Sequence, residues 1–438
     1  MIALLDCNNF YVSCERLFSP KLKNKPVVVL SNNDGCVISR SNEAKELGIT
    51  MGEPFFKIKK ITKNLQIEVL SSNYSLYADI SDRIMSILKK KFLEVEVYSI
   101  DEAFFYLNNK SKNEIICSEI AKKILKWVGI PVSIGIAKTK TLAKISNRVI
   151  KKKSNYKNIK FKYSNVLEIK SDEDLNYVLK NTKVADVWGV GNRLSNFLVN
   201  NNIKSALNLR DSNEDFIKKE KGILIKKTIY ELRNIKCYQI EKEPTVKKSI
   251  CVSRSFGSKI YDYEDINRAL VVYVHKAVIK LVKNNLFCRS ITVFLKTSRY
   301  DEKIYSNSKT YKLLEATCDI RLIWKISKDI LKFLYVKAFA YNKVGIILSD
   351  FSQRKEIQQS LIGDKLKNIT VKNEIKLMNV IEKINKKFGE GKIRLLANSD
   401  HRFFYTDKEP RVSWQMKSAF RSACYTTNWC DIPKVKVK

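Results

Sequence analysis

Two adjacent carboxylates interrupt a strand-like segment that reads Tyr98-Ser99-Ile100-Asp101-Glu102-Ala103-Phe104-Phe105. Side chains upstream alternate between apolar and polar, and those downstream are apolar or aromatic, so we expect two strands joined by a turn. Tight hairpin turns favour Asn-Gly or Asp-Gly because they require positive φ, and Asp101-Glu102 does not suit that requirement. A polar surface turn is one interpretation. The other, which we favour, is a site for a divalent metal ion.

A third carboxylate lies near the N-terminus. Ile2-Ala3-Leu4-Leu5 is a short apolar run typical of a buried strand, and it ends in Asp6. If this strand pairs beside the hairpin, Asp6, Asp101 and Glu102 converge on one edge of a sheet. Mg²⁺ binds carboxylate oxygens together with substrate phosphates, and a two-metal centre suits in-line phosphoryl transfer. The sequence therefore predicts phosphoryl transfer at these three acids.

The composition indicates a globular, strongly basic protein. With 438 residues, of which 45% are hydrophobic and 29% charged, the chain has room for several domains with real cores. Lys and Arg number 82 against 45 Asp and Glu, a formal charge of +37. A lysine-rich background from an AT-biased genome would raise this figure without any function. An excess of this size still indicates a polyanionic partner, with nucleic acid first.

The apolar runs, cysteines and histidines argue against a membrane-spanning, secreted, zinc-binding or disulfide-bonded protein. No apolar run is long enough to span a membrane, and the chain begins with a strand-like run instead of a signal peptide, so we expect a cytoplasmic protein. The ten Cys are scattered without a C-x-x-C pair, and His275 and His401 are the only histidines. This argues against a zinc site or a disulfide framework and favours reduced, mostly buried thiols.

Two aromatic residues follow the first strand. Phe10 and Tyr11 lie within five residues of Asp6, at the start of an expected helix. We expect Phe10 in the core. For Tyr11, a core ring and a ring beside the site are both open.

The next strand is expected at 25–30, and a short basic helix is expected after it. It runs from about Ser39 to Leu47 and is closed by Gly48. It carries Arg40 and Lys45, which could grip a triphosphate or form an ordinary solvated face.

The order of the next segments indicates a ferredoxin-like domain. Apolar residues at helical spacing over 74–93 and 114–127, and a strand-like run at 132–137, complete a βαββαβ-like order. The helix expected over 139–149 has one apolar face. Its basic face comprises Lys140, Lys144, Arg148 and Lys151. The segment 151–170 is expected to be a loop and a hairpin.

Two further domains are expected. Around 170–236, Gly189-Val190-Gly191 lacks the third glycine of a dinucleotide-binding motif, because Leu194 occupies that position. A hairpin between two helices fits better, and backbone N–H groups at its second helix can hold a DNA phosphate. After a polar linker at 241–245, strands and helices to residue 350 repeat the βαββαβ order without acids at strand ends, which suits DNA binding more than chemistry.

Four motifs together resemble those of the Y-family translesion DNA polymerases, and in particular the UmuC type. They are Asp6 with Phe10-Tyr11, Ser31-Asn32-Asn33-Asp34-Gly35-Cys36-Val37-Ile38, Ser72-Asn73-Tyr74 and Tyr98-Ser99-Ile100-Asp101-Glu102-Ala103. The resemblance runs essentially from end to end. It implies an α+β, multidomain right-hand polymerase with a ferredoxin-like palm, small fingers, a helical helix-hairpin-helix thumb, a βαββαβ little finger and a C-terminal tail. The implied ranges are palm 1–20 and 74–168, fingers 21–73, thumb 169–240, little finger 245–350 and C-terminal region 351–438.

The resemblance also implies roles for individual residues. Asp6, Asp101 and Glu102 would bind two Mg²⁺, with the Cys7 carbonyl as an added ligand. Lys45 and Lys144 would contact the incoming triphosphate. Tyr11 would be the steric gate against ribonucleotides, with Phe10 as the alternative. The implied DNA contacts are Gly189, Gly191 and Arg193 in the thumb and Arg254 in the little finger.

The C-terminal region offers one partner motif. Gln358-Gln359-Ser360-Leu361-Ile362 resembles a sliding-clamp pentapeptide, with Gln358, Leu361 and Ile362 as its anchors, although Ile362 stands where the family often has Phe and a chance match is equally open. Ser422-Ala423-Cys424 departs from the Pro-Arg usual before Tyr-Thr-Thr. The resemblance implies primer–template DNA, dNTP, a sliding clamp, a UmuD-type subunit and a RecA filament as partners.

The sequence thus predicts a DNA-templated DNA polymerase for damaged templates, of low fidelity by resemblance. Two other classes are open. A non-catalytic DNA-binding scaffold is disfavoured by the three intact acids. A metal-dependent nuclease is disfavoured by Lys45, Lys144 and the thumb-like hairpin.

Overall fold

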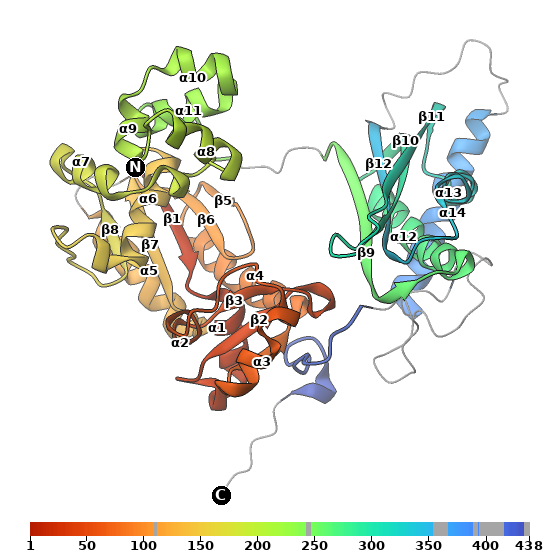
Figure 1. Cartoon of the computed structure of the whole chain (residues 1–438), viewed down its shortest axis with the longest axis horizontal. Helices are drawn as coiled ribbons and strands as arrows, with labels where there is room; N and C mark the ends of the chain where they lie inside the picture. The colour runs from red at the N-terminus through yellow and green to blue at the C-terminus, as the bar shows by residue number, and fades with distance from the viewer. Residues whose placement is uncertain (109–111, 242–246, 354–366, 389–392, 394–415, 433–438) are drawn as a thin grey trace, which may run out of the picture. The chain divides into compact units, whose positions relative to one another are not determined.

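The computed structural model describes residues 1–108, 112–241, 247–353, 367–388, 393 and 416–432 (Figure 1). The chain divides into two compact units. Unit 1 comprises Met1–Ser31, Gly35–Pro244 and Ala419–Lys438, and unit 2 comprises Asn32–Asp34 and Thr245–Ser418. The finer division into palm, fingers, thumb and little finger at the implied boundaries stays a prediction.

A five-stranded sheet forms the centre of unit 1. Its strand order is β5 (Val95–Val97), β6 (Glu102–Tyr106), β1 (Ile2–Cys7), β7 (Val132–Ala137) and β8 (Val166–Glu168). All of β1 is buried, as its continuous apolar run predicts. β1 is antiparallel to both β6 and β7. The strands β1, β5, β6 and β7 and their connecting helices have the ferredoxin-like arrangement that was predicted.

Helices cover both faces of this sheet. The helices α1 (Phe10–Phe18), α4 (Tyr74–Lys91) and α5 (Asn113–Val128) pack on the face that carries Ala3 and Leu5. The helix α6 (Lys140–Lys151) packs on the opposite face, which carries Ile2 and Leu4. Successive residues of β1 therefore serve two different cores, because side chains alternate along a strand.

Gly135 in β7 lets α6 lie directly against the sheet. A Cβ atom at this position would come within 2.3 Å of the Asn147 backbone nitrogen and 2.4 Å of the Ala143 carbonyl oxygen. Both neighbours are backbone atoms of α6, which cannot rotate out of the way, so the close approach requires glycine. This contact sets the height at which the basic side chains of α6 meet the end of β1.

A smaller, three-stranded sheet lies beyond α1 in the chain. Its order is β3 (Val37–Arg40), β2 (Val27–Leu30) and β4 (Glu68–Ser71), flanked in sequence by α2 (Asn42–Glu46) and α3 (Phe55–Asn64). Short 3-10 turns occur at η1 (Pro20–Leu22) and η2 (Asn32–Asp34).

The expected helix from Ser39 to Leu47 is wrong at its start. Ser39 and Arg40 belong to β3, and α2 begins only at Asn42. The Ser41 side chain caps α2 by accepting a hydrogen bond from the Ala44 backbone N–H at 3.2 Å. Gly48, with φ +83°, follows the helix in the left-handed conformation expected of a terminating glycine.

The expected hairpin between residues 151 and 170 is present only as one antiparallel bridge, between Tyr163 and Val166. This segment contains the turn η3 (Lys153–Asn155) and then β8, which pairs in parallel with β7. Parallel pairing requires a crossover connection, and α6 supplies it. β8 thereby extends the central sheet, and its local pairing is limited to that one bridge.

Helices follow β8, as predicted. They are α7 (Asp172–Asn181), α8 (Asn192–Asn200), α9 (Ala206–Asp211), α10 (Glu214–Lys221) and α11 (Ile223–Leu232), with the 3-10 turn η4 (Val184–Asp186) before α8. Gly191 is the N-cap of α8, and Gly189 has φ +87° in the turn before it. The predicted hairpin between two helices is therefore present.

Unit 2 has the predicted order of strands and helices. It comprises β9 (Ser249–Ile260), α12 (Tyr263–Lys283), β10 (Leu286–Thr297), β11 (Ser306–Thr317), α13 (Ile320–Leu334), β12 (Tyr341–Gln353) and α14 (Lys367–Phe388). The sheet order is β11-β10-β12-β9, with every pair antiparallel. Its first strand lies at an edge, whereas β1 of unit 1 lies inside its sheet. The two units share an element order but not a topology.

Three expectations remain, on the cysteines, on membrane-spanning helices and on the clamp-like motif. The ten cysteines, all in described parts of the chain, are free thiols, and five of them are buried. Among the described residues, no helix is both long enough and apolar enough to cross a membrane. The clamp-like motif with Gln358, Leu361 and Ile362 lies outside the described residues.

Candidate active site

The backbone pairing of β1 with β6 brings the three predicted acids together. Glu102 lies directly opposite Asp6 in the antiparallel register. One residue further along, the Cys7 backbone N–H donates to the Asp101 carbonyl oxygen at 2.9 Å. The convergence expected from sequence is therefore present, and it depends on main-chain hydrogen bonds more than on side chains.

The turn that carries Asp101 is held by its own serine. The Ser99 hydroxyl donates to Asp101 Oδ1 at 2.6 Å and accepts from the Glu102 backbone N–H at 3.0 Å. None of the residues from Tyr98 to Glu102 has positive φ. The turn is thus not the tight type that needs Asn-Gly, which explains why two acids are tolerated there.

Lysines from α6 neutralise two of the acids. Lys151 Nζ lies 2.5 Å from Asp6 Oδ1, and Lys144 Nζ lies 2.9 and 3.2 Å from the two Glu102 oxygens. The two lysines are seven residues apart and therefore share one helix face. Two ammonium groups thus provide positive charge where the acids gather.

The electrostatics of Asp6 show why this site favours cations. Burial raises the pKa of Asp6 to about 6. The ammonium of Lys151 opposes that rise, whereas the charges of Glu102 and Asp101 add to it. A buried carboxylate beside two others is costly unless positive charge compensates it.

The donor set fits a hard divalent cation. Carboxylates at Asp6, Asp101 and Glu102, together with backbone carbonyls, are the oxygen ligands that Mg²⁺ prefers. Burial raises the pKa of the Cys7 thiol well above its usual range, so this residue offers its carbonyl oxygen and not a thiolate. In the described parts of the chain, no three acidic, His or Cys side chains are already clustered around one point. Asp6 and Glu102 are instead directed at their lysine partners.

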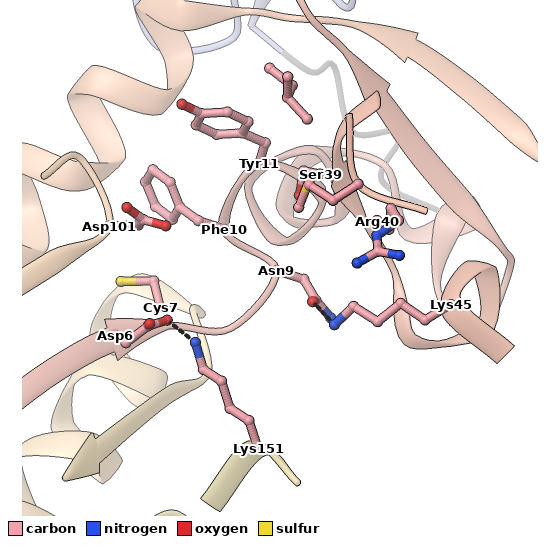
Figure 2. Close-up of a pocket in the computed structure, with 12 residues that line it drawn as sticks. Asp6, Cys7, Asn9, Phe10, Tyr11, Ser39, Arg40, Lys45, Asp101 and Lys151 are labelled. Carbon is pink, nitrogen blue, oxygen red and sulfur yellow. Dashed lines mark hydrogen bonds and ion pairs between the residues drawn. The ribbon is translucent and has the colours of Figure 1, made fainter. Parts of the chain in front are cut away.

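A cavity of about 320 Å³ opens beside the acids (Figure 2). Asp6 and Asp101 lie at one side, and Arg40, Lys45 and Lys151 supply positive charge. Its full lining is Asp6, Cys7, Asn9, Phe10, Tyr11, Ile38, Ser39, Arg40, Lys45, Met51, Asp101 and Lys151. A cavity that offers both carboxylates and ammonium groups suits a metal-bound polyphosphate.

Asn9 connects the acidic and basic parts of this cavity. It adopts the left-handed conformation, with φ 48° and ψ 45°, between β1 and α1. Its Oδ1 accepts a hydrogen bond from Lys45 Nζ at 2.5 Å, and its Nδ2 donates to Asn42 Oδ1 at 3.0 Å. Burial and the nearby charges of Arg40 and Lys151 lower the pKa of Lys45. The basic residues are therefore close enough to repel one another.

Tyr11 is both a packed ring and a cavity wall. It is half-buried, and it stacks on Tyr77 with ring centroids 4.4 Å apart and planes 14° apart. Its ring also meets Tyr74 edge-on at 6.1 Å. Phe10, by contrast, is only 4% exposed, as expected of a core residue. Burial raises the pKa of Tyr11 to about 12, so the ring carries a neutral hydroxyl at physiological pH.

Lys144 lies apart from the first cavity. It contributes instead to a neighbouring cavity of about 310 Å³, shared with Glu102, Lys151 and Trp188. Its Nζ also lies 4.7 Å from the centre of the Tyr98 ring. Of the two lysines assigned to the triphosphate by resemblance, only Lys45 lines the cavity shown in Figure 2.

The expected DNA-contacting residues lie on exposed surfaces, and none of them lines the cavity beside Asp6 and Asp101. Gly189, Gly191 and Arg193 are exposed around the start of α8 in unit 1. Arg254 is exposed on β9 in unit 2.

Two cavity residues were not singled out from sequence. Lys151 was counted only as part of a basic helix face, although its spacing from Lys144 places both on the side of α6 that meets the acids. Asn9 carried no signal beyond its place just after a strand, where asparagine tolerates the left-handed conformation.

The sheet, the three acids and the adjoining helices define the Y-family DNA polymerase fold. A Y-family DNA polymerase chimera, Dbh-Dpo4(243-245)-Dbh, aligns with a TM-score of 0.62 at 23% identity, covering 81% of this chain and all of that one. An insertion ternary complex of Dbh DNA polymerase aligns with a TM-score of 0.50 at 24% identity, again over 81% of this chain and all of that one.

Sequence comparison narrows this class to one family. Residues 5–148 match the impB/mucB/samB family, and residues 247–361 match the impB/mucB/samB family C-terminal domain. Protein ImpB of Salmonella typhimurium is 37% identical over the full length of both chains, and so is Protein UmuC of Salmonella typhimurium. The chain therefore belongs to the impB/mucB/samB family, which confirms the resemblance found in the motifs. Residues 375–435 match a domain of unknown function.

A more distant relative carries an enzyme name. DNA polymerase IV of Picrophilus torridus is 32% identical over 57% of this chain and 70% of that protein.

Proposed function

We propose that the chain is a translesion DNA polymerase that adds deoxynucleotides to a primer 3′-OH on damaged templates, in DNA repair and SOS mutagenesis. The observation that carries this proposal is the register of Asp6 against Glu102, which puts three acids beside a cavity with a basic side. Relatives named UmuC and DNA polymerase IV support the same activity.

Asp6, Asp101 and Glu102, with the Cys7 carbonyl, would hold two Mg²⁺ ions. When bound, the metal supplies a more acidic primer hydroxyl and neutralisation of the phosphate charge that develops during transfer. The chain's own residues compensate the charge of the acids before a metal ion binds. Lys151 and Lys144 pair with Asp6 and Glu102 and compensate their charge beforehand, and both lysines would be free to contact phosphate once these acids hold a metal ion.

The basic side of the cavity would bind the triphosphate. Lys45 and Arg40 come from the small sheet and its helix, and Lys151 comes from α6, so the phosphates would bridge the two sheets of unit 1. Lys144 would join them once it leaves Glu102. Tyr11 would lie against the sugar and exclude the ribose 2′-OH by its rigid ring.

Binding of the DNA would be largely independent of sequence. The formal charge of +37 favours the phosphate backbone. Backbone N–H groups at the start of α8, near Gly189, Gly191 and Arg193, can hold one phosphate, and Arg254 can contact another.

Further partners of the proposed enzyme are a sliding clamp at Gln358, Leu361 and Ile362, a UmuD-type subunit and a RecA filament. All three rest on the resemblance alone, whereas the expected cytoplasmic location rests on the apolar runs of the sequence and on its strand-like start.

Primer extension separates this function from its rivals. The protein is incubated with a labelled primer–template, dNTPs and Mg²⁺, and the primer length is measured. A polymerase lengthens the primer, a nuclease shortens it and a scaffold only retards it. Asp101→Asn and Glu102→Gln should abolish extension and leave DNA binding nearly unchanged, because metal ligands act on the transition state. The exposed Asp82→Asn on α4 is the control. Substantial extension by either site variant would contradict the assignment.

A further inference from the structure

A segment from the end of the chain is part of unit 1. Residues Ala419–Lys438 belong to this unit, of which 419–432 are described, although the whole of unit 2 precedes them in sequence. The Ser71 backbone N–H donates to the Phe420 carbonyl oxygen at 3.0 Å, and the Phe420 N–H donates to Ser71 Oγ at 3.0 Å. We call residues 419–432 the tail segment. It extends the end of β4 by strand-like pairing.

Two further contacts anchor the tail segment. Asn73, which is fully buried, donates through Nδ2 to Ser422 Oγ and to the Ala423 carbonyl oxygen, each at 3.0 Å. The Tyr425 ring stacks on Phe18 of α1, with centroids 4.8 Å apart and planes 8° apart. Contacts to β4, to the start of α4 and to α1 together fix the segment on unit 1.

The tail segment completes a buried hydrogen-bond network. Ser422 Oγ donates to Glu15 Oε1 at 3.1 Å, and the Tyr77 hydroxyl donates to the same oxygen at 2.7 Å. Glu15 is only 1% exposed and Tyr77 is fully buried. A carboxylate withdrawn from water needs such donors, because each lost one leaves an unsatisfied charge. Ser422 supplies one of the two side-chain donors to this oxygen.

This network leads directly to Tyr11. The Tyr77 ring that donates to Glu15 is the ring on which Tyr11 stacks. Glu15 also lies four residues after Tyr11 on α1, which places both on one side of that helix. Tyr11 is thus supported from two directions by groups that meet at one carboxylate. A ring that excludes the ribose 2′-OH by direct contact loses selectivity when the ring is displaced by about 1 Å.

We propose that Ser422 is a positioning residue, and that the tail segment holds Tyr11 against the nucleotide sugar through Glu15 and Tyr77. This part of a domain of unknown function thereby contributes to the exclusion of ribonucleotides. The inference rests on the proposed role of Tyr11 as the gate. A tail segment that only stabilised the fold would lower the melting temperature without changing which sugar is accepted.

The test measures kcat/KM for the matching rNTP and dNTP on one undamaged template, with the melting temperature of each variant. Ser422→Ala and Tyr77→Phe each remove one donor to Glu15 and should raise the rNTP/dNTP ratio by about threefold to tenfold, the range that one hydrogen bond supports. Ser422→Thr keeps the hydroxyl and should restore the ratio. Trp429→Ala, at an 89% exposed position in the same segment, should leave it unchanged.

The variant Tyr11→Ala distinguishes the proposed role of Ser422 from the proposed role of Tyr11 as the steric gate. It should raise the ratio further, and adding Ser422→Ala to it should change nothing more, because the position of an absent ring has no effect. If Tyr11→Ala raises the ratio and neither Ser422→Ala nor Tyr77→Phe does, the gate stands and the role of the tail segment is overturned. If Tyr11→Ala leaves the ratio unchanged, both are overturned. Should Ser422→Ala not fold, Ser422→Cys decides, since it replaces the hydroxyl of the tail segment by a weaker donor of similar size.

Discussion

Lys151 contacts Asp6 at 2.5 Å, and this pair joins the basic face of α6 to the acid at the end of β1. The same lysine lines the cavity beside Arg40 and Lys45. If the proposed function holds, Lys151 would have two successive roles: it would neutralise Asp6 before the metal binds, and it would contact phosphate once Asp6 has another partner.

Replacing Lys151 should weaken nucleotide use more than DNA binding. For Lys151→Ala we expect kcat/KM for dNTP to fall by about tenfold to a hundredfold, the range for a lost hydrogen bond to a charged group. Steady-state single-nucleotide insertion measures this. Lys157→Ala, an exposed lysine in the following loop, is the control. Equal losses in the two variants would indicate only a general effect of charge.

Gly135→Ala should move α6 and damage the site from a distance. The added Cβ would meet backbone atoms of α6 at 2.3 and 2.4 Å, so the helix has to shift. We expect a loss of about 1–3 kcal/mol in unfolding free energy, as for other overpacked cores, together with reduced primer extension. Gly191→Ala is the matched control for stability, because its Cβ would meet nothing within 4 Å. An unchanged melting temperature for Gly135→Ala would contradict the packing described.

Glu15 should make the folding stability of unit 1 depend on pH. Burial raises the pKa of this carboxyl above its usual value, although hydrogen bonds from Tyr77 and Ser422 oppose the rise. Because the folded-state pKa exceeds the unfolded one, the contribution of Glu15 to stability is full below the unfolded pKa and is lost as the pH rises through the folded pKa.

The variant Glu15→Gln cannot ionise, so its stability relative to the natural protein should increase as the pH rises above the usual pKa of a glutamate. Denaturant unfolding at several pH values measures the difference. Glu46→Gln, at an exposed position, should show no such trend. A difference that falls with rising pH would mean that the folded protein favours the ionised carboxylate.

DNA affinity should depend steeply on salt and little on sequence. With a formal charge of +37, we expect a log–log salt slope steeper than about −3, since each phosphate contact contributes roughly −0.9 in duplex DNA. Arg193→Ala and Arg254→Ala should each reduce the slope by about 1, on any sequence. Lys90→Ala, at the exposed end of α4, is the control. A shallow slope would show that phosphate contacts are few.

Deleting residues 358–362 should lower synthesis stimulated by a sliding clamp and leave synthesis by the polymerase alone unchanged. Extension on a circular primed template, with and without clamp, measures both. If clamp stimulation survives the deletion, the resemblance of this pentapeptide to a clamp motif is accidental.

Local patterns were enough to predict the acids of the site. Asp6 follows an apolar run and Asp101-Glu102 follows an alternating one, so strand periodicity placed the acids near strand ends, although β1 continues to Cys7 and β5 already ends at Val97. The start of α2 was missed because Ser39 and Arg40 fit a helix face as well as a strand. Short amphipathic segments leave that choice to their neighbours, and here β2 pairs with them.

Features that depend on distant partners could not be predicted. The parallel pairing of β8 with β7 and the edge position of β9 are decided by which strands meet in the folded chain. The contact of Lys151 with Asp6 likewise joins two elements that lie far apart in the sequence. No pattern in the sequence connects Ser422 with Glu15, which are 407 positions apart.

The place of the tail segment also has a consequence for synthesis on the ribosome. Every acid of the site is translated early, and the sheet that carries them is complete once β8 has emerged. Ser422 emerges only after all of unit 2, so a nascent chain holds its acids long before it holds the last donor to Glu15. A premature stop codon between the end of β12 and residue 419 would therefore leave the three acids in place and remove the tail segment, and a protease cut there would leave it attached to unit 1 by non-covalent contacts alone.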